Sequence, residues 1–221
     1  MKNQATTNKS TVAPAGDSSA DKVLALTGEA VLLDVKLKTK QPIEKRWTKL
    51  SLSDMTPFYI SKLVSNIGVS LGDPSNGLHS IDCDESEFFE ELKKLNPLFK
   101  NTLHSHGARG GNFWIRIEGD KPKSGKIRLI NSKAPVGEWR STGNQTIIYG
   151  THPSGVQYQN NGKKVIDLSF DQIKWPDNWD LPWCRKLSST NTRNYSTEDA
   201  SYISSEVVET MLFSIPTRPD Y

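Results

Sequence analysis

The sequence predicts an α+β domain in which a mixed or antiparallel sheet is flanked by helices. Short apolar runs recur along the chain and are bounded by Gly, Pro and Asn, which is typical of strands and turns. A few segments instead carry apolar residues at the three- and four-residue spacing of helices. With 221 residues and 35% hydrophobic content, the chain suffices for one ordinary domain with polar tails.

Composition divides the chain into four parts. Residues 1–20 are rich in Ser, Thr, Asn, Lys, Ala and Gly, which predicts a disordered leader. Residues 21–186 hold the apolar runs of the predicted domain, and residues 187–200 have the polar content of a linker. An amphipathic helical pattern follows within residues 201–221.

Charge, cysteine count and hydropathy indicate which partners, metal sites and compartments the sequence favours. The net charge of +3, from 28 basic and 25 acidic residues, is too balanced to indicate a nucleic-acid partner by itself. Cys83 and Cys184 give neither a disulfide framework nor zinc spacing, and a buried Cys83 suits a reducing cytoplasm. No apolar run approaches the ~20 residues of a membrane span, and no secretory signal begins the chain, so no membrane partner is expected.

The first apolar segment, residues 22–37, predicts a short helix, a break at Gly28 and a strand. Pro42 interrupts the next segment, and Trp47 is expected to anchor it on the core. This segment carries the densest basic cluster of the chain, which consists of Lys36, Lys38, Lys40, Lys45, Arg46 and Lys49. The cluster is either a solvated loop or a rim that faces phosphates. Capping by Ser53 or Asp54 then predicts a helix that carries apolar residues 58–64.

An acidic pair follows the next two predicted strands. Strands over residues 67–71 and 78–84, joined by a glycine-rich turn, predict a hairpin. Because residues i and i+2 of a strand face the same side, Asp82 and Asp84 project together. Two ionised carboxylates repel each other unless a cation lies between them, and Mg²⁺ or Mn²⁺ prefers oxygen ligands. The alternative is two exposed acids at a strand end that begin the helix predicted over residues 86–94.

A glycine-rich loop precedes the next strand. Its backbone amides, together with Arg109, can hold an anion near Gly110 and Gly111. His104 and His106 in the same loop invite a metal interpretation, and a plain glycine turn is the other possibility. Strands over residues 113–117 and 127–130 are predicted on either side of a charged hairpin turn.

A second informative stretch lies around His152. This residue comes directly after a strand predicted over residues 145–149 and is fixed by Pro153. An Asn-Gly turn then predicts a hairpin within residues 156–170, on which Asp167 points away from the buried face. Trp-rich residues 173–183 are expected to close the domain.

The order of these motifs resembles the bifunctional DNA primase/polymerase (prim-pol) domain of the archaeo-eukaryotic primase superfamily, over about residues 30–180. The similarity is carried by four segments, which are Lys40–Trp47, Asn66–Val69 with Ile81–Asp84, Gly110–Gly111, and Gly150–Tyr158. It implies an archaeo-eukaryotic primase-like (RRM-like) catalytic core. For residues 201–221 it implies the start of the helical module that follows such domains in primase-helicase proteins.

Two positions depart from the family pattern. Gly150 stands where the family usually has Ser, so a hydroxyl contact to the incoming nucleotide is either absent or supplied by Thr151. The third motif, an apolar residue followed by Asp, is best matched at Asp167, with Asp171 and Glu138 as alternatives.

The resemblance implies template-dependent nucleotidyl transfer in the replication of a plasmid, phage or similar mobile element. Asp82, Asp84 and His152 would be the catalytic residues, and two divalent ions, Mg²⁺ or Mn²⁺, would be held by Asp82, Asp84 and Asp167. His152, Arg109 and Arg140 would contact the triphosphate of a dNTP or rNTP on a single-stranded DNA template. A helicase domain or protein is a further implied partner.

Two other functions remain open from the sequence. Gly150 and the short spacing between His152 and Asp167 favour a catalytically degenerate nucleic-acid-binding module, whereas the intact acidic pair and His152 favour the enzyme. A metal-dependent nuclease would use the same carboxylates. Trp114 and Trp139 either stack on bases or pack in the core.

Overall fold

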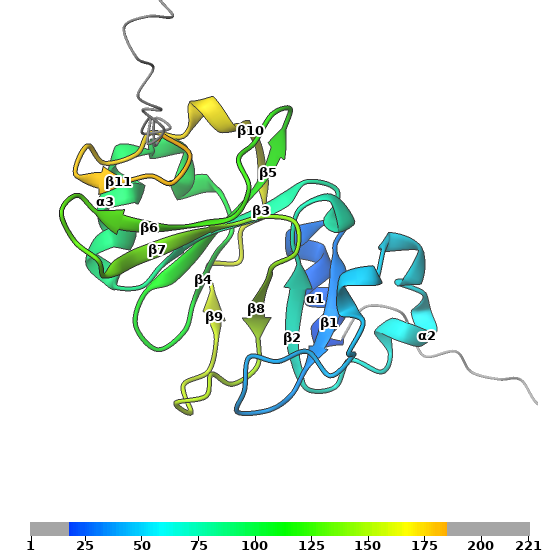
Figure 1. Cartoon of the computed structure of the whole chain (residues 1–221). Helices are drawn as coiled ribbons and strands as arrows, with labels where there is room; N and C mark the ends of the chain where they lie inside the picture. The colour runs from blue at the N-terminus through cyan, green and yellow to red at the C-terminus, as the bar shows by residue number, and fades with distance from the viewer. Residues whose placement is uncertain (1–17, 185–221) are drawn as a thin grey trace, which may run out of the picture. The chain divides into compact units, whose positions relative to one another are not determined.

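A computed structural model describes residues 18–184 (Figure 1). This part of the chain is α+β, with two mostly antiparallel sheets and few helices, which confirms the predicted class. The predicted linker and C-terminal helix, and most of the predicted leader, lie outside the described residues. Within residues 18–184, none of the helices has the length and apolar character needed to cross a membrane.

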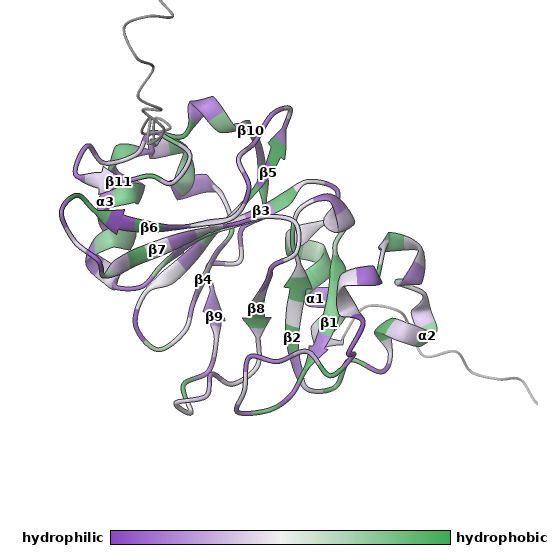
Figure 2. Ribbon diagram, in the orientation of Figure 1, coloured by the Kyte–Doolittle hydropathy of each residue, from purple (hydrophilic) through white to green (hydrophobic). Residues whose placement is uncertain are grey.

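The small sheet has the strand order β1-β2-β8, and each pair is antiparallel. Its strands are β1 (Val31–Val35), β2 (Asn66–Ser70) and β8 (Gln145–Tyr149). Every residue of β2, the central strand, is buried, and Figure 2 shows hydrophobic segments in both β1 and β2. β8 therefore forms an edge of this sheet and carries the chain toward His152.

Helix α1 (Ser19–Thr27) packs on the small sheet and confirms the predicted order of helix, Gly28 and strand. The Ser18 hydroxyl accepts a hydrogen bond from the backbone N–H of Asp21, so the helix begins before residue 20. The last two residues of the leader predicted for residues 1–20 therefore belong to α1. Gly28 ends the helix at a φ of 68°, which only glycine adopts readily.

The large sheet has the order β11-β6-β7-β3-β5-β4-β9, and β10 pairs with β5 in parallel. Its strands are β3 (Leu78–Cys83), β4 (His104–His106), β5 (Gly111–Glu118), β6 (Gly125–Leu129), β7 (Pro135–Arg140), β9 (Gln159–Asn160), β10 (Ile166–Ser169) and β11 (Trp179–Asp180). Helix α3 (Ser86–Leu95) covers one face of this sheet, where Phe89 and Leu92 pack against Ile81 and Phe113 (Figure 1). Cys83 lies in the same core, as predicted. The side chain of Asp82 therefore belongs to the opposite face, which α3 does not cover.

The three predicted hairpins are wrong, although each of their strands lies close to its predicted position. β2 and β3 belong to different sheets, and a single bridge between Gly72 and Leu78 is what remains of the first hairpin. β5 and β6 are separated by β7 and β3, while β9 pairs with β4 and β10 with β5. Apolar alternation fixes which residues form a strand, but the partner of that strand is selected by tertiary packing.

The helix predicted over residues 58–64 is also shorter than expected. Ser51 and Asp54 bond reciprocally around a 3₁₀ turn (Leu52–Asp54), so the predicted cap closes that turn instead. Helix α2 (Pro57–Ile60) follows with Thr56 as its cap, and Phe58 is 70% exposed. The other 3₁₀ turns are Trp47–Lys49, Asp73–Ser75, Pro97–Asn101 and Phe170–Gln172.

Candidate active site

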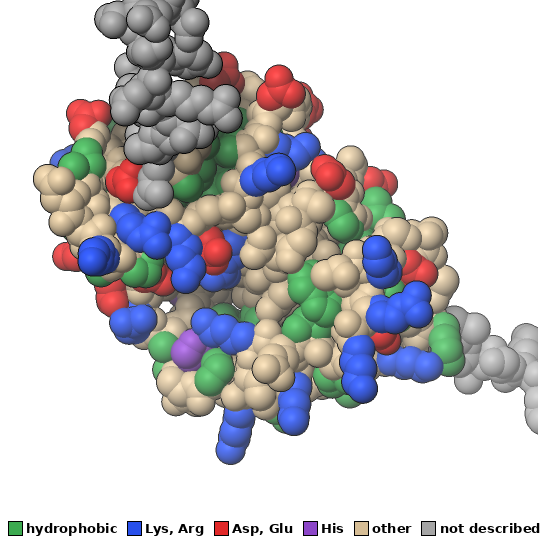
Figure 3. All heavy atoms as spheres, in the orientation of Figure 1, with side chains coloured by type: hydrophobic (Ala, Val, Ile, Leu, Met, Phe, Trp, Pro, Cys, Tyr) green, Lys and Arg blue, Asp and Glu red, His purple; other side chains and the backbone are tan. Residues whose placement is uncertain are grey.

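A cavity of about 640 Å³ lies between the small sheet and the uncovered face of the large sheet. Its lining includes the sequence-predicted residues Asp82, Asp84, Arg109, Arg140 and His152. Figure 3 shows this face hollowed near its centre, with acidic side chains among Lys and Arg. The structure thus brings together the two widely separated motifs on which the primase resemblance chiefly depends.

The acidic pair sits at the end of β3, in the middle of the large sheet. Asp82 lies directly opposite Glu138 on β7 and opposite Asn112 on β5. Because directly paired residues of antiparallel strands face the same side, these three polar side chains all face the cavity. Glu138, one of the three alternatives for the third metal ligand, is therefore the acid beside Asp82.

Glycines make room for the backbone that carries the acidic pair. A Cβ added to Gly110 would lie 1.8 Å from the carbonyl oxygen of Cys83, and one added to Gly137 would lie 2.2 Å from that of Asp82. Both distances are far below any van der Waals contact, so neither position tolerates a side chain without a backbone shift. The glycine step predicted at Gly110 is thus a packing requirement of the site.

We expect Gly110→Ala to lower the free energy of unfolding by about 1–3 kcal/mol, because the added methyl group overlaps a backbone oxygen. Gly107→Ala is the matched control, since its Cβ would meet only the Tyr158 and His152 side chains, at 3.2 and 3.4 Å. Urea unfolding of both variants measures the difference. Equal stability of the two variants would contradict the close packing of Gly110 on β3.

Arg140 neutralises two of the cavity's carboxylates. Its Nη2 donates to Oδ2 of Asp82 at 2.6 Å, and its Nε donates to Oε2 of Glu138 at 2.9 Å. A third bond runs from Nη1 to the hydroxyl of Thr146 at 3.2 Å. Burial lowers the pKa of Arg140, but the two carboxylates outweigh it and raise that pKa overall. The guanidinium thus occupies a position between acids where a cation is favoured.

Asp84 differs from Asp82 in having no fixed counter-ion. Among residues 18–184, no hydrogen bond or ion pair holds its carboxylate. Burial and the neighbouring charge of Asp82 raise the pKa of Asp84, while Arg140 and Arg109 oppose that rise. Asp84 is therefore a carboxylate whose charged form would gain from an added cation.

The donor set of the cavity fits a hard divalent ion. The side-chain oxygen of Asn112 is buried and has no hydrogen-bond partner in the described part of the chain. Unpaired buried acceptors are costly, so an oxygen of this kind beside Asp82 favours a ligand that it can coordinate. Within residues 18–184, no three His, Cys, Asp or Glu side chains are already arranged as metal ligands, and Arg140 holds two of these carboxylates instead.

His152 stands on the other wall of the cavity in a defined orientation. Its Nδ1 accepts a hydrogen bond from the backbone N–H of Ser154 at 3.1 Å, so the neutral ring carries its proton on Nε2. Burial and the charges of Lys40 and Arg109 lower the pKa of His152. These positive neighbours favour an anionic ligand beside the ring.

Tyr158 packs edge-on against His152, with ring centroids 5.7 Å apart. Burial and the charge of Asp82 raise the pKa of Tyr158 to about 12. Its phenol therefore stays protonated at neutral pH and can serve as a hydrogen-bond donor in the cavity.

Asn66 explains the glycine at position 150, where the motif that this stretch resembles usually has Ser. Gly150 has a φ of 108°, and a Cβ there would lie 2.0 Å from Oδ1 of Asn66. That oxygen accepts the backbone N–H of Thr151 at 2.7 Å, while the hydroxyl of Thr151 accepts from Gln157 at 2.8 Å. The departure at position 150 is thus a consequence of local packing, and Thr151 is not among the residues that line the cavity.

The structure does not bring Asp167 to the acidic pair. Its Oδ1 pairs with Nε of Arg116 at 3.7 Å. Arg116 lies on β5, directly opposite Leu78 of β3. Leu78 is four residues from Asp82 along β3, which is on the order of 13 Å. Asp171 lies in an exposed 3₁₀ turn and does not line the cavity either.

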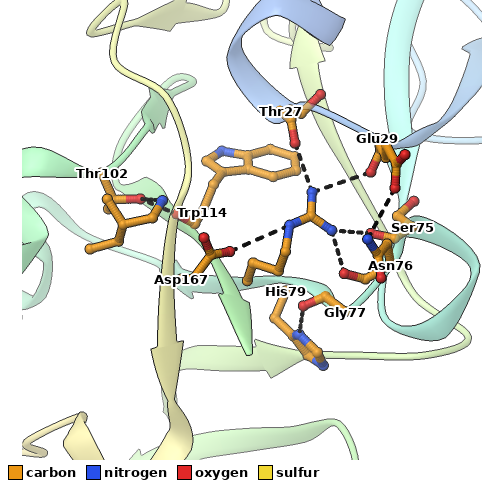
Figure 4. A network of polar contacts seen from close by, with 11 residues as sticks. Thr27, Glu29, Ser75, Asn76, Gly77, His79, Thr102, Trp114 and Asp167 are labelled. Atoms are coloured by element: carbon orange, nitrogen blue, oxygen red, sulfur yellow. Dashed lines mark hydrogen bonds and ion pairs between the residues drawn. The ribbon is translucent and has the colours of Figure 1, made fainter. Parts of the chain in front are cut away.

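An ion pair with Arg116 accounts for the position of Asp167 on β10. The guanidinium donates to the backbone oxygens of Ser75 at 2.8 Å and of Thr27 at 2.9 Å, and further bonds reach Asn76 and Glu29 (Figure 4). It therefore ties the end of α1 to the turn before β3. Asp167 closes this network from β10.

The other residues that the sequence suggested for the site divide into two groups, those in the core and those that line the cavity. His104 and His106 lie on the core side, where their rings contact Phe89, and neither lines the cavity. Trp114 and Trp139 are fully buried, so they pack in the core and cannot stack on bases. Trp47, expected only as a core anchor, lines the cavity as well. Arg109 is at the edge of the cavity, paired with Glu85 at 2.7 Å.

No protein-family model matches this chain, and no curated protein matches it in sequence. The primase resemblance therefore remains a prediction from the four motifs. The strand order supports the coarser α+β assignment only.

Proposed function

We propose that this chain is a template-dependent nucleotidyltransferase of the prim-pol type, a DNA primase and polymerase that acts in the replication of a plasmid, phage or similar mobile element. The supporting observation is that Asp82, Asp84 and His152 line one cavity with basic side chains around it. An acidic cluster facing a cationic wall suits a nucleoside triphosphate, because its phosphates need both metal and protein cations.

In this proposal, Asp82, Asp84 and Glu138 hold the divalent ions, with Asn112 as a further oxygen donor. When bound, the two ions supply activation of the attacking hydroxyl and neutralisation of the leaving pyrophosphate. His152 donates its Nε2–H to a phosphate oxygen, in the orientation that Ser154 fixes. Lys40 and Arg109 add positive charge on the same side.

Primer extension on a single-stranded template tests this function, with labelled dNTP or rNTP and with Mg²⁺, Mn²⁺ or neither. We expect incorporation that depends on the metal. Glu138→Gln should lose incorporation, whereas Asp167→Asn should keep it and lose at most about 1 kcal/mol of stability with its partly exposed ion pair. The proposal fails if the wild-type chain incorporates no nucleotide under any of these conditions. The reverse result for the two variants would restore Asp167 as the third ligand.

A nucleic-acid-binding module without catalysis is the second candidate, because Arg140 already neutralises Asp82 and Glu138. In such a module the ion pairs would be permanent, and a divalent ion would not compete with the guanidinium. A plasmid-nicking assay without nucleotides separates both candidates from a metal-dependent nuclease.

A further inference from the structure

We propose that the segment between β1 and the Trp47–Lys49 turn binds the phosphates of a single-stranded nucleic acid and leads it to the cavity. We call residues 36–49 the basic rim. The inference rests on the proposed function and adds to it the path of the template strand. It decides between the two interpretations of this cluster, a solvated loop and a phosphate-facing rim.

The basic side chains of the rim form no ion pairs within the described part of the chain, and Glu44, the one acid of the rim, accepts a hydrogen bond from the backbone N–H of Arg46. Every basic side chain of the rim is exposed, namely those of Lys36, Lys38, Lys40, Lys45, Arg46 and Lys49. Within residues 18–184, no carboxylate forms an ion pair with any of them, whereas Lys93, Arg109 and Lys121 elsewhere each have an acidic partner. Figure 3 shows basic side chains gathered on the lower part of this face, below the hollow. A cluster of exposed cations without ion-pair partners favours binding of a phosphate backbone.

The basic rim is held in place by backbone hydrogen bonds. The N–H of Lys36 donates to the oxygen of Gln41 at 3.0 Å, and the N–H of Ile43 donates to the oxygen of Asp34 at 2.8 Å. From β8, Nε2 of Gln145 donates to the oxygen of Lys40 at 2.8 Å. These bonds fix Lys40 at the cavity, so the positive surface is continuous with the candidate active site.

An aromatic side chain stands where the basic rim meets the cavity. Trp47 is partly buried against the small sheet and also lines the cavity. Aromatic platforms beside cationic grooves are typical of single-strand binding, because unpaired bases stack on them without regard to sequence. Trp47 is thus placed to receive the first base that enters the cavity.

An anionic membrane surface is the other partner that exposed cations can attract, and Leu37 and Ile43 are 59% and 57% exposed. Burial of apolar side chains in a membrane interface, however, uses an amphipathic helix with a broad apolar face. The basic rim contains only a three-residue 3₁₀ turn. Its continuity with the cavity therefore favours nucleic acid.

Fluorescence anisotropy of a labelled oligo(dT) of about 20 nucleotides tests the proposal. The full chain is titrated in EDTA, without nucleotides, over a range of salt concentrations. We expect the triple variant Lys38→Gln, Lys45→Gln, Lys49→Gln to reduce the slope of log K against log[salt] by about 2 and to weaken binding at 0.1 M salt on the order of ten- to a hundred-fold. Trp47→Ala should weaken binding about ten-fold at every salt concentration.

The matched control is Lys94→Gln, Lys100→Gln, Lys174→Gln, which removes the same charge from exposed positions on and beside α3. We expect this control to keep the wild-type slope. An equal loss in both triple variants, or no loss in the rim variant, would overturn the proposal. Should the rim triple variant fail to fold, Lys45→Gln alone should reduce the slope by about 0.7.

Two further measurements separate the remaining explanations. Sedimentation with phosphatidylserine vesicles should show no binding that depends on the rim lysines. If the vesicles bind the rim as tightly as oligo(dT) does, the assignment to nucleic acid is overturned. Asp167→Asn, which removes an acid outside the cavity, should bind oligo(dT) like the wild type. Failure of primer extension with intact, rim-dependent oligo(dT) binding would therefore count against the nucleotidyl-transfer function and leave the basic rim standing.

Discussion

Asp84→Asn is expected to abolish nucleotide incorporation, by about 10³-fold or more, without lowering the thermal stability of the protein at pH 7. A divalent ion contributes several kcal/mol of charge stabilisation in the transition state, and each 1.36 kcal/mol corresponds to a tenfold change in rate. Within residues 18–184, Asp84 has no ion-pair partner. Its replacement by Asn therefore leaves no cation unpaired. The variant thus separates catalysis from folding.

The pH dependence of stability follows from the raised pKa of Asp84. A carboxyl group whose pKa is higher in the folded than in the unfolded state favours folding while it is protonated, and this contribution is lost as the pH rises above the ordinary value of 3.8. At pH 7 the wild type therefore carries a penalty that Asn lacks. We expect the melting temperature of Asp84→Asn to equal or exceed that of the wild type at pH 7, with the difference shrinking as the pH falls toward 3.8.

Differential scanning calorimetry at several pH values, with and without Mn²⁺, provides the measurement. Mn²⁺ should stabilise the wild type more than Asp84→Asn, because the variant has lost one ligand. Asp167→Asn, which removes an acid outside the cavity, is the control and should respond to Mn²⁺ like the wild type. Full incorporation by Asp84→Asn, or loss of its folded state, would contradict the assignment of Asp84 as a metal ligand.

The convergence of the acidic pair and His152 in one cavity could be predicted from the sequence, whereas the choice among Asp167, Asp171 and Glu138 as the acid beside them could not. Asp82 and Asp84 follow an apolar run whose alternation places them on one face, and His152 follows another strand at a rigid turn. Glu138 lies on β7, whose sequence mixes Pro, Gly and charged residues and gives no clear strand pattern. Its place beside Asp82 depends on the pairing of β7 with β3, which local sequence does not encode.

The local sequence does not encode which strands pair with one another in this fold. The turn at residues 72–77 carries the glycines of a hairpin, yet it transfers the chain from the small sheet to the large one. The glycine at position 72 is required there because a Cβ would lie 2.1 Å from the Thr142 hydroxyl. A turn signal therefore identifies where the chain changes direction, and long-range packing decides which strand it then meets.

Arg140→Met is expected to bind Mn²⁺ at least tenfold more tightly than the wild type while losing about 3 kcal/mol of stability without metal. The guanidinium bridges Asp82 and Glu138 at 2.6 and 2.9 Å, so it competes with any cation that needs the same oxygens. Its removal leaves two partly buried carboxylates without a counter-charge, which destabilises the fold. A bound divalent ion restores that counter-charge, so Mn²⁺ should raise the stability of this variant more than that of the wild type.

Titration of Mn²⁺ by electron paramagnetic resonance gives the affinity directly, and urea unfolding with and without Mn²⁺ gives the stabilities. Arg140→Lys is the matched variant, because an ammonium group keeps the charge but cannot bridge both carboxylates in the same way. We expect its affinity for Mn²⁺ to lie between those of the wild type and Arg140→Met. If Arg140→Met binds Mn²⁺ no more tightly than the wild type, Asp82 and Glu138 do not serve as metal ligands. That result would favour the binding module, because two-metal nucleotidyl transfer needs these carboxylates to hold the ions.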